Sequence, residues 1–185
     1  MASPKSTRQF QLVFHLILAF CILVMVLGAT TFDFFEFEPA LDLTVRYFAL
    51  PVTVAMIPFS ILLYLKYIIH AETKVYKKKH WIWLRTSFRV LTLVVSMSLI
   101  LLGTCLSAII LTNAYLGNSK LVHVKGTIRE YECRTTKGRV HHHIKVDDPH
   151  LGRTIKFEVS QPYVEGELFE KQMTIGKWGL LYSDE

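Results

Sequence analysis

Three long apolar runs dominate the first 116 residues of the chain. They cover residues 10–29, 47–69 and 90–116, and no charged residue interrupts the centre of any run. A helix needs roughly 20 apolar residues to cross the hydrocarbon core of a bilayer. The pattern therefore predicts three transmembrane helices with a lipid bilayer around them.

After residue 117 the period of the apolar residues changes to two. Val122, Val124 and Ile128 share one face, and similar alternation covers residues 140–146, 155–159 and 169–175. Alternation of this kind indicates half-buried strands, and turn residues separate the four segments. With a short last strand at 178–182, about five antiparallel strands would form a small barrel or sandwich. The predicted fold class is thus membrane α + β, with a membrane domain at 1–116 and a β domain at 117–185.

Composition and charge support this division. Charged residues make up 19% of the chain, whereas a soluble domain carries about 25%. Of the net charge of +6, residues 117–185 contribute only +1, from eleven Lys and Arg against ten Asp and Glu. A nucleic-acid-binding domain concentrates positive charge on a folded face, so no nucleic acid partner is expected.

The loops between the apolar runs differ in charge. Residues 66–89 contain seven Lys and Arg against Glu72 alone, while the first loop contains four acidic residues against Arg46. An excess of Lys and Arg marks the cytoplasmic side. The N-terminus and loop 66–89 are therefore predicted to be cytoplasmic, and the β domain extracytoplasmic. The layout resembles that of bacterial membrane families with a small β module, which implies a bacterial cytoplasmic (inner) membrane.

The first loop interleaves phenylalanines with acids between Phe32 and Glu38. We expect its apolar side chains to anchor in the outer membrane interface while the carboxylates face water. A cation site formed by the acids is the alternative. In the third run, Gly103 and Ser107 are four residues apart, which permits close approach of another helix. That helix could belong to the same chain or to a second copy, so a homo-oligomer through span three is left open.

The candidate metal ligands are His141 and His143. On a strand these two side chains point outward, while His142 points toward the core. Two histidines chelate a metal weakly, since a structural site usually has four ligands. If the hairpin turns near Lys137, His143 would face Arg129, and a neighbouring cation disfavours a bound metal.

Catalytic signatures are absent from the sequence. It contains no G-x-S-x-G, H-E-x-x-H, P-loop or G-x-G-x-x-G pattern, so neither an enzyme nor a cofactor site is predicted. The leading hypothesis is a non-enzymatic membrane protein whose β domain binds a protein partner or modulates an envelope complex, as an accessory or immunity-type protein. The alternatives are a metal-binding or metal-sensing envelope protein, and an oligomeric transporter or channel component.

Overall fold

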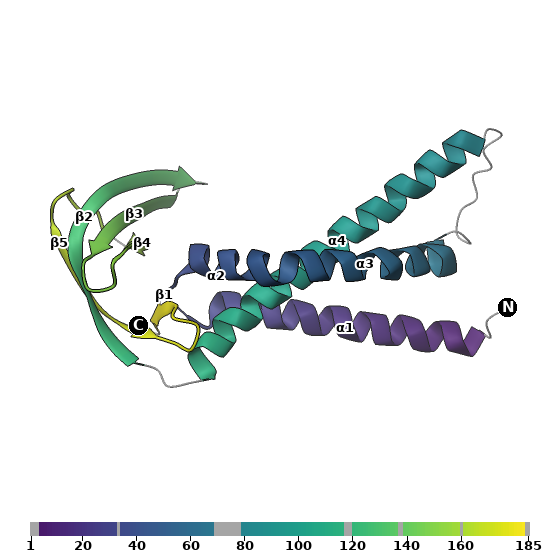
Figure 1. Ribbon diagram of the computed structural model, residues 1–185, viewed down its shortest axis with the longest axis horizontal. Helices are drawn as coiled ribbons and strands as arrows, with labels where there is room; N and C mark the ends of the chain where they lie inside the picture. The colour runs from purple at the N-terminus through teal and green to yellow at the C-terminus, as the bar shows by residue number, and fades with distance from the viewer. Residues whose placement is uncertain are drawn as a thin grey trace. The chain divides into compact units, whose positions relative to one another are not determined.

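A computed structural model describes residues 4–32, 34–68, 79–116, 120–136, 139–159 and 161–183, shown in Figure 1. The chain divides into two units. Residues 1–29 and 40–109 form the membrane unit, and residues 30–39 and 110–185 form the β unit. Residues 30–39 of the loop between the first two predicted spans therefore belong to the β unit, together with the last turns of the third helix.

The membrane unit is helical throughout its described part. Its elements are α1 (Pro4–Thr30), α2 (Phe37–Thr44), the π-helical turn η1 (Val45–Ala49), α3 (Leu50–Leu63), the π-helical turn η2 (Tyr64–Ile68) and α4 (Lys79–Tyr115). Three stretches are long and apolar enough to cross a membrane: Leu12–Thr30, Phe37–Lys66 and His80–Tyr115, with mean hydropathies of 2.8, 2.1 and 2.4. The prediction of three long apolar helices is confirmed.

Two helix boundaries differ from the predicted spans. The second helical stretch starts at Phe37 instead of residue 47, because the polar residues before the apolar run continue the helix. The third helix, α4, starts at Lys79, so residues 79–89 are helical and not loop. Its 37 residues give a length of about 55 Å at 1.5 Å per residue. The rest of the basic loop, residues 69–78, lies outside the described residues.

Small residues allow α1 and α4 to pack closely within the membrane unit. A Cβ atom added at Gly28 would lie 2.5 Å from the Cβ of Ser107, and one added at Gly103 would lie 2.8 Å from the sulfur of Met25. The small-residue face predicted on the third span is therefore occupied by the first helix of the same chain. A homo-oligomer, which stays a prediction, would have to use another face.

The β unit is one antiparallel sheet that curls into a half-barrel (Figure 1). Its strands are β1 (Phe34–Phe35), β2 (Lys120–Thr136), β3 (Arg139–Asp148), β4 (Arg153–Val159), β5 (Leu168–Ile175) and β6 (Leu181–Ser183), in the spatial order β1-β6-β5-β2-β3-β4. The alternating residues of the sequence form its core: Val124, Ile128, Ile144, Val146, Ile155, Phe157, Phe169, Met173 and Leu181.

Strand β1 was not expected, because it comes from the loop between the first two helices. Its two residues pair with Tyr182 and Ser183 of β6. The Phe34 ring lies 4.8 Å from the ring of Phe157, and Phe32 lies 5.3 Å from Tyr182. These contacts show that the loop contributes a strand and aromatic side chains to the β unit, where interfacial anchoring had been expected.

The register of the β2–β3 hairpin also differs from the expected one. Thr136 is opposite Arg139, and an irregularity between Ile128 and Glu130 shifts the pairing further along β2. His143 is therefore opposite Glu132, not Arg129. The expected register was wrong because the hairpin closes nearer to Arg139, which moves every later pair along the strand.

Candidate functional site

A buried ion pair joins the two edge strands of the half-barrel. Glu36 follows β1, Arg153 begins β4, and these strands lie at opposite ends of the sheet order. The Nη2 of Arg153 donates a hydrogen bond of 2.7 Å to Oε2 of Glu36 and one of 3.2 Å to the carbonyl of Gly179. The same carboxylate oxygen accepts a bond of 2.7 Å from the N–H of Leu181. Together with the Phe34–Phe157 contact, this pair holds the two edges together through side chains.

The Glu36 carboxyl is the most strongly shielded charged group of this junction. Its side chain is only 4% exposed, while that of Arg153 is 35% exposed. Burial raises the pKa of Glu36 above its usual value of 4.5, and the Leu181 N–H and the charge of Arg153 oppose that shift. The carboxylate thus depends on Arg153 for compensation of its charge.

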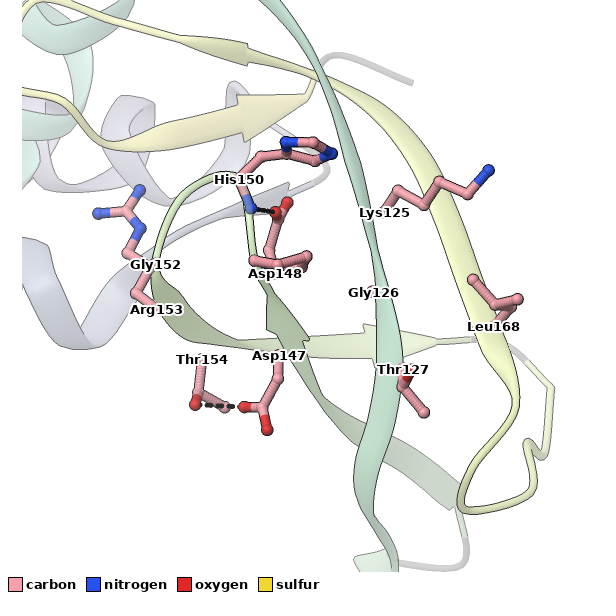
Figure 2. A pocket seen from close by; sticks show the side chains of 11 residues that line it. Lys125, Gly126, Thr127, Asp147, Asp148, His150, Gly152, Arg153, Thr154 and Leu168 are labelled. Atoms are coloured by element: carbon pink, nitrogen blue, oxygen red, sulfur yellow. Dashed lines mark hydrogen bonds between the residues drawn. The ribbon is translucent and has the colours of Figure 1, made fainter.

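An open pocket of about 740 Å³ lies beside this junction, at the β3–β4 turn (Figure 2). Its volume is in the range typical of ligand-binding pockets. At its floor β2 passes close to β3, since a Cβ at Gly126 would collide with the carbonyl group of Asp147. The lining residues come from four strands, β2 to β5, and a turn: Lys125, Gly126, Thr127, Asp147, Asp148, Pro149, His150, Gly152, Arg153, Thr154 and Leu168.

Several charged groups around the pocket pair with one another. Asp147 accepts a hydrogen bond of 2.5 Å from the hydroxyl of Thr154, as Figure 2 shows, and lies 3.8 Å from Arg129. Lys125 lies 3.5 Å from Glu170. These exposed pairs contribute little to stability. They leave both signs of charge at the rim, which suits a polar ligand.

Asp148 differs from the other acids of the pocket. It is only 2% exposed, and its Oδ1 accepts bonds from the N–H groups of His150 (2.7 Å) and Leu151 (3.2 Å). Its Oδ2 is buried and has no hydrogen-bond partner among the described residues. An unpaired buried carboxylate oxygen is costly, and this atom is an acceptor that the described residues leave without a donor.

The predicted metal ligands are only partly described. His143 is half-buried in β3, with Glu132 opposite it on one side and Glu158 on the other. His141 is opposite Arg134, but its side chain lies outside the described residues. Within the described part of the chain no group of three or more His, Cys, Asp and Glu side chains is arranged to hold a metal ion. A metal site at His141 and His143 stays a prediction.

Neither the Glu36–Arg153 junction nor the pocket was predicted from the sequence. Glu36 and Arg153 are 117 residues apart, and no local pattern links them. The alternation of phenylalanines and acids at 32–38 was the available signal, because alternation is typical of a half-buried strand.

Comparison with protein-family models, curated proteins and solved structures gives no match for this chain. The chemistry of the β unit itself therefore carries the functional argument. The pocket offers an unpaired acceptor oxygen, two hydroxyl groups and charges of both signs, which are groups that bind polar ligands.

Proposed function

We propose that this is a non-enzymatic multi-pass membrane protein whose β unit binds a protein partner and modulates an envelope complex, as an accessory or immunity-type protein. The observation that carries the proposal is the pocket at the β3–β4 turn with the unpaired Oδ2 of Asp148. A Lys or Arg side chain of a partner could enter an open pocket of this size and pair with the exposed carboxylate of Asp147, which lines it beside Asp148.

The distribution of charge supports an extracytoplasmic position for the β unit. Lys and Arg are concentrated in residues 66–89 and at the N-terminus, which favours the cytoplasm for both. With an odd number of spans, we infer that the β unit lies on the other side of a bacterial cytoplasmic membrane. Cys133 tests this arrangement, because it is exposed in the β unit while Cys21 and Cys105 lie in helices α1 and α4.

For that test, intact cells are treated with a membrane-impermeant maleimide. We expect labelling of the native chain and none of a Cys133→Ser variant. Labelling that requires cell lysis would place the β unit in the cytoplasm and overturn the proposed orientation.

The binding proposal is tested by purifying the tagged full chain from its native membrane in mild detergent and identifying stoichiometric companions by mass spectrometry. Thr127→Trp fills the pocket from an exposed position on β2. Gln172→Trp is the matched control, since Gln172 is exposed on the neighbouring strand β5 and outside the pocket lining. We expect the partner to be lost with the first variant and retained with the second. Purification of the chain alone, or equal recovery of the partner with both variants, would contradict the proposal.

A further inference from the structure

A second pocket, of about 450 Å³, lies along the first turns of α4 in the membrane unit. Its described lining residues are Trp81, Leu84, Arg85 and Phe88. These positions are three or four residues apart, so their side chains share one face of the helix. Among these lining residues Arg85 alone is charged, so the pocket combines apolar walls with one permanent positive charge.

The pocket faces away from the second span. The hydroxyl groups of Tyr64, at the start of η2, and Thr86 are 3.2 Å apart, and Tyr64 is only 2% exposed. The Thr86 side of α4 therefore packs against the end of that span. At about 100° per residue, the middle of the pocket lies roughly 150° around the helix from Thr86. Trp81, Leu84 and Phe88 are 54%, 54% and 69% exposed, and such side chains contact lipid when the helix spans a bilayer.

Arg85 lies at the depth of the lipid headgroups. The uncharged apolar run of α4 begins at Val90, and the five residues from Val90 back to Arg85 extend about 7–8 Å along the helix axis. The interfacial layer between hydrocarbon and water is roughly 5–7 Å thick on each side of a bilayer. Phe88 lies only about 3 Å from Val90 along the axis. The pocket thus extends from the edge of the hydrocarbon core to the headgroup layer, where tryptophans such as Trp81 are enriched.

The charge around the pocket favours an anionic ligand. Arg89 follows Arg85 by one turn on the same side of α4, and both are half-buried. Residues 66–89 together contain seven Lys and Arg against Glu72 alone. The Nη1 atom of Arg85 is buried, so the guanidinium lies against the pocket wall. A guanidinium binds a phosphate through two parallel N–H bonds, and partial exclusion of water strengthens that attraction.

We propose that this pocket binds one anionic phospholipid, such as phosphatidylglycerol. The guanidinium of Arg85 binds the phosphate, Leu84 and Phe88 contact the first methylene groups, and Trp81 covers the headgroup. A volume of about 450 Å³ is in the range of small-molecule sites and accommodates this part of a lipid. A zwitterionic lipid offers the same phosphate, but its own ammonium group competes for that phosphate, so the site prefers the anionic lipid. None of the four residues lines the pocket of the β unit, so this proposal is independent of the partner-binding proposal.

The test measures fluorescence quenching in phosphatidylcholine vesicles that contain a minor share of brominated phosphatidylglycerol. A parallel set of vesicles contains the same share of brominated phosphatidylcholine. The full chain carries Phe88→Trp as its probe, and its three native tryptophans are replaced by phenylalanine. Bromine quenches tryptophan only at close range, so the ratio of quenching by the two lipids reports which lipid occupies the pocket.

A second probe position separates a site from the general attraction of anionic lipid to the basic end of the membrane unit. Leu62 is 65% exposed on α3, and Leu62 and Phe88 each lie two residues from the Tyr64–Thr86 contact toward the centre of the bilayer. Leu62→Trp in the same tryptophan-free background therefore reports from a similar depth outside the pocket. We expect the quenching ratio for Phe88→Trp to be about fivefold greater than that for Leu62→Trp, which corresponds to the headgroup attraction of one arginine.

Two charge variants complete the test with the Phe88→Trp probe. Arg85→Gln should lower the ratio to the value for Leu62→Trp. Lys66→Gln is the matched control, because Lys66 is exposed at the same end of the membrane unit and outside the pocket lining, and it should leave the ratio unchanged. Equal ratios at the two probe positions, or a ratio that Arg85→Gln leaves unchanged, would overturn the proposal. Absence of quenching by both lipids, as expected if a second copy of the chain covered the pocket, would overturn it as well.

Discussion

Replacement of Arg153 by methionine removes the charge that compensates the buried Glu36 carboxylate while keeping most of the apolar stem. Removing one partner of a buried ion pair costs roughly 3–5 kcal/mol. Arg153 is 35% exposed, so water can reach part of the vacated space, and we expect a loss of about 2–3 kcal/mol in the unfolding free energy of the β unit. In a domain of this size that loss lowers Tm by roughly 10–20 °C.

Glu36→Gln supplies the second arm of a double-mutant cycle. Glutamine keeps an acceptor for the Leu181 N–H but carries no charge. In that background Arg153→Met should cost only about 1 kcal/mol, the value of ordinary hydrogen bonds. The expected coupling between Glu36 and Arg153 is therefore about 1–2 kcal/mol.

The stability of the native chain and of these variants should change with pH in a definite direction. The pKa of Glu36 is raised above 4.5 in the folded chain, so its contribution to stability is fully present below the unfolded pKa and is lost as pH rises through the folded pKa. Arg153→Met removes a charge that lowers this pKa, so the variant should lose more stability between pH 4.5 and pH 7 than the native chain. In the Glu36→Gln background, Arg153→Met should no longer change how stability depends on pH.

The assay is thermal unfolding of the full chain in detergent, followed by the fluorescence of Trp178 in a Trp81→Phe/Trp83→Phe background. Trp178 is the tryptophan of the β unit, and its indole N–H donates a bond of 3.0 Å to Thr112. If Arg153→Met lowers Tm at pH 7 by the same amount in the native chain and in the Glu36→Gln variant, the reasoning is refuted.

Two further predictions concern packing within each unit. Asn113→Leu removes bonds of 3.0 Å to the Leu180 carbonyl and 2.9 Å from the Trp178 N–H. It should cost the β unit about 1–3 kcal/mol because the Trp178 N–H loses its acceptor, while the Leu180 carbonyl keeps its bond from the Gly176 N–H. Trp178 fluorescence measures this loss. Gly28→Val forces methyl groups into the contact with Ser107 and should separate α1 from α4. The expected result is a lower Tm of the membrane unit, measured by circular dichroism at 222 nm, where helices dominate the signal.

Matched controls separate these effects from general damage. Thr112→Val removes the exposed bond to the Trp178 indole and should cost less than about 1 kcal/mol. Ala29→Val enlarges an exposed side chain next to Gly28 and should leave Tm unchanged. A loss with either control equal to that of its partner variant would contradict the corresponding prediction.

Local patterns in the sequence were sufficient for the elements and for their division into two classes. Apolar runs of transmembrane length predicted the three helices, and the two-residue period from Val122 to Ile175 predicted the strands β2 to β5 with their inward faces. The predictions of the helices and of the strands succeed for the same reason. The spacing of apolar residues reports directly which face of a helix or strand avoids water.

The tertiary structure decided which distant residues meet. The curl of the sheet brings Glu36 to Arg153 and Phe34 to Phe157, and the register of the β2–β3 hairpin brings Cys133 to His142. A one-residue change of register moves a side chain to the opposite face, and a half-barrel closes only through contacts between its edges. Such pairings depend on the whole sheet, so periodicity along one strand determines its inward face but not its neighbours.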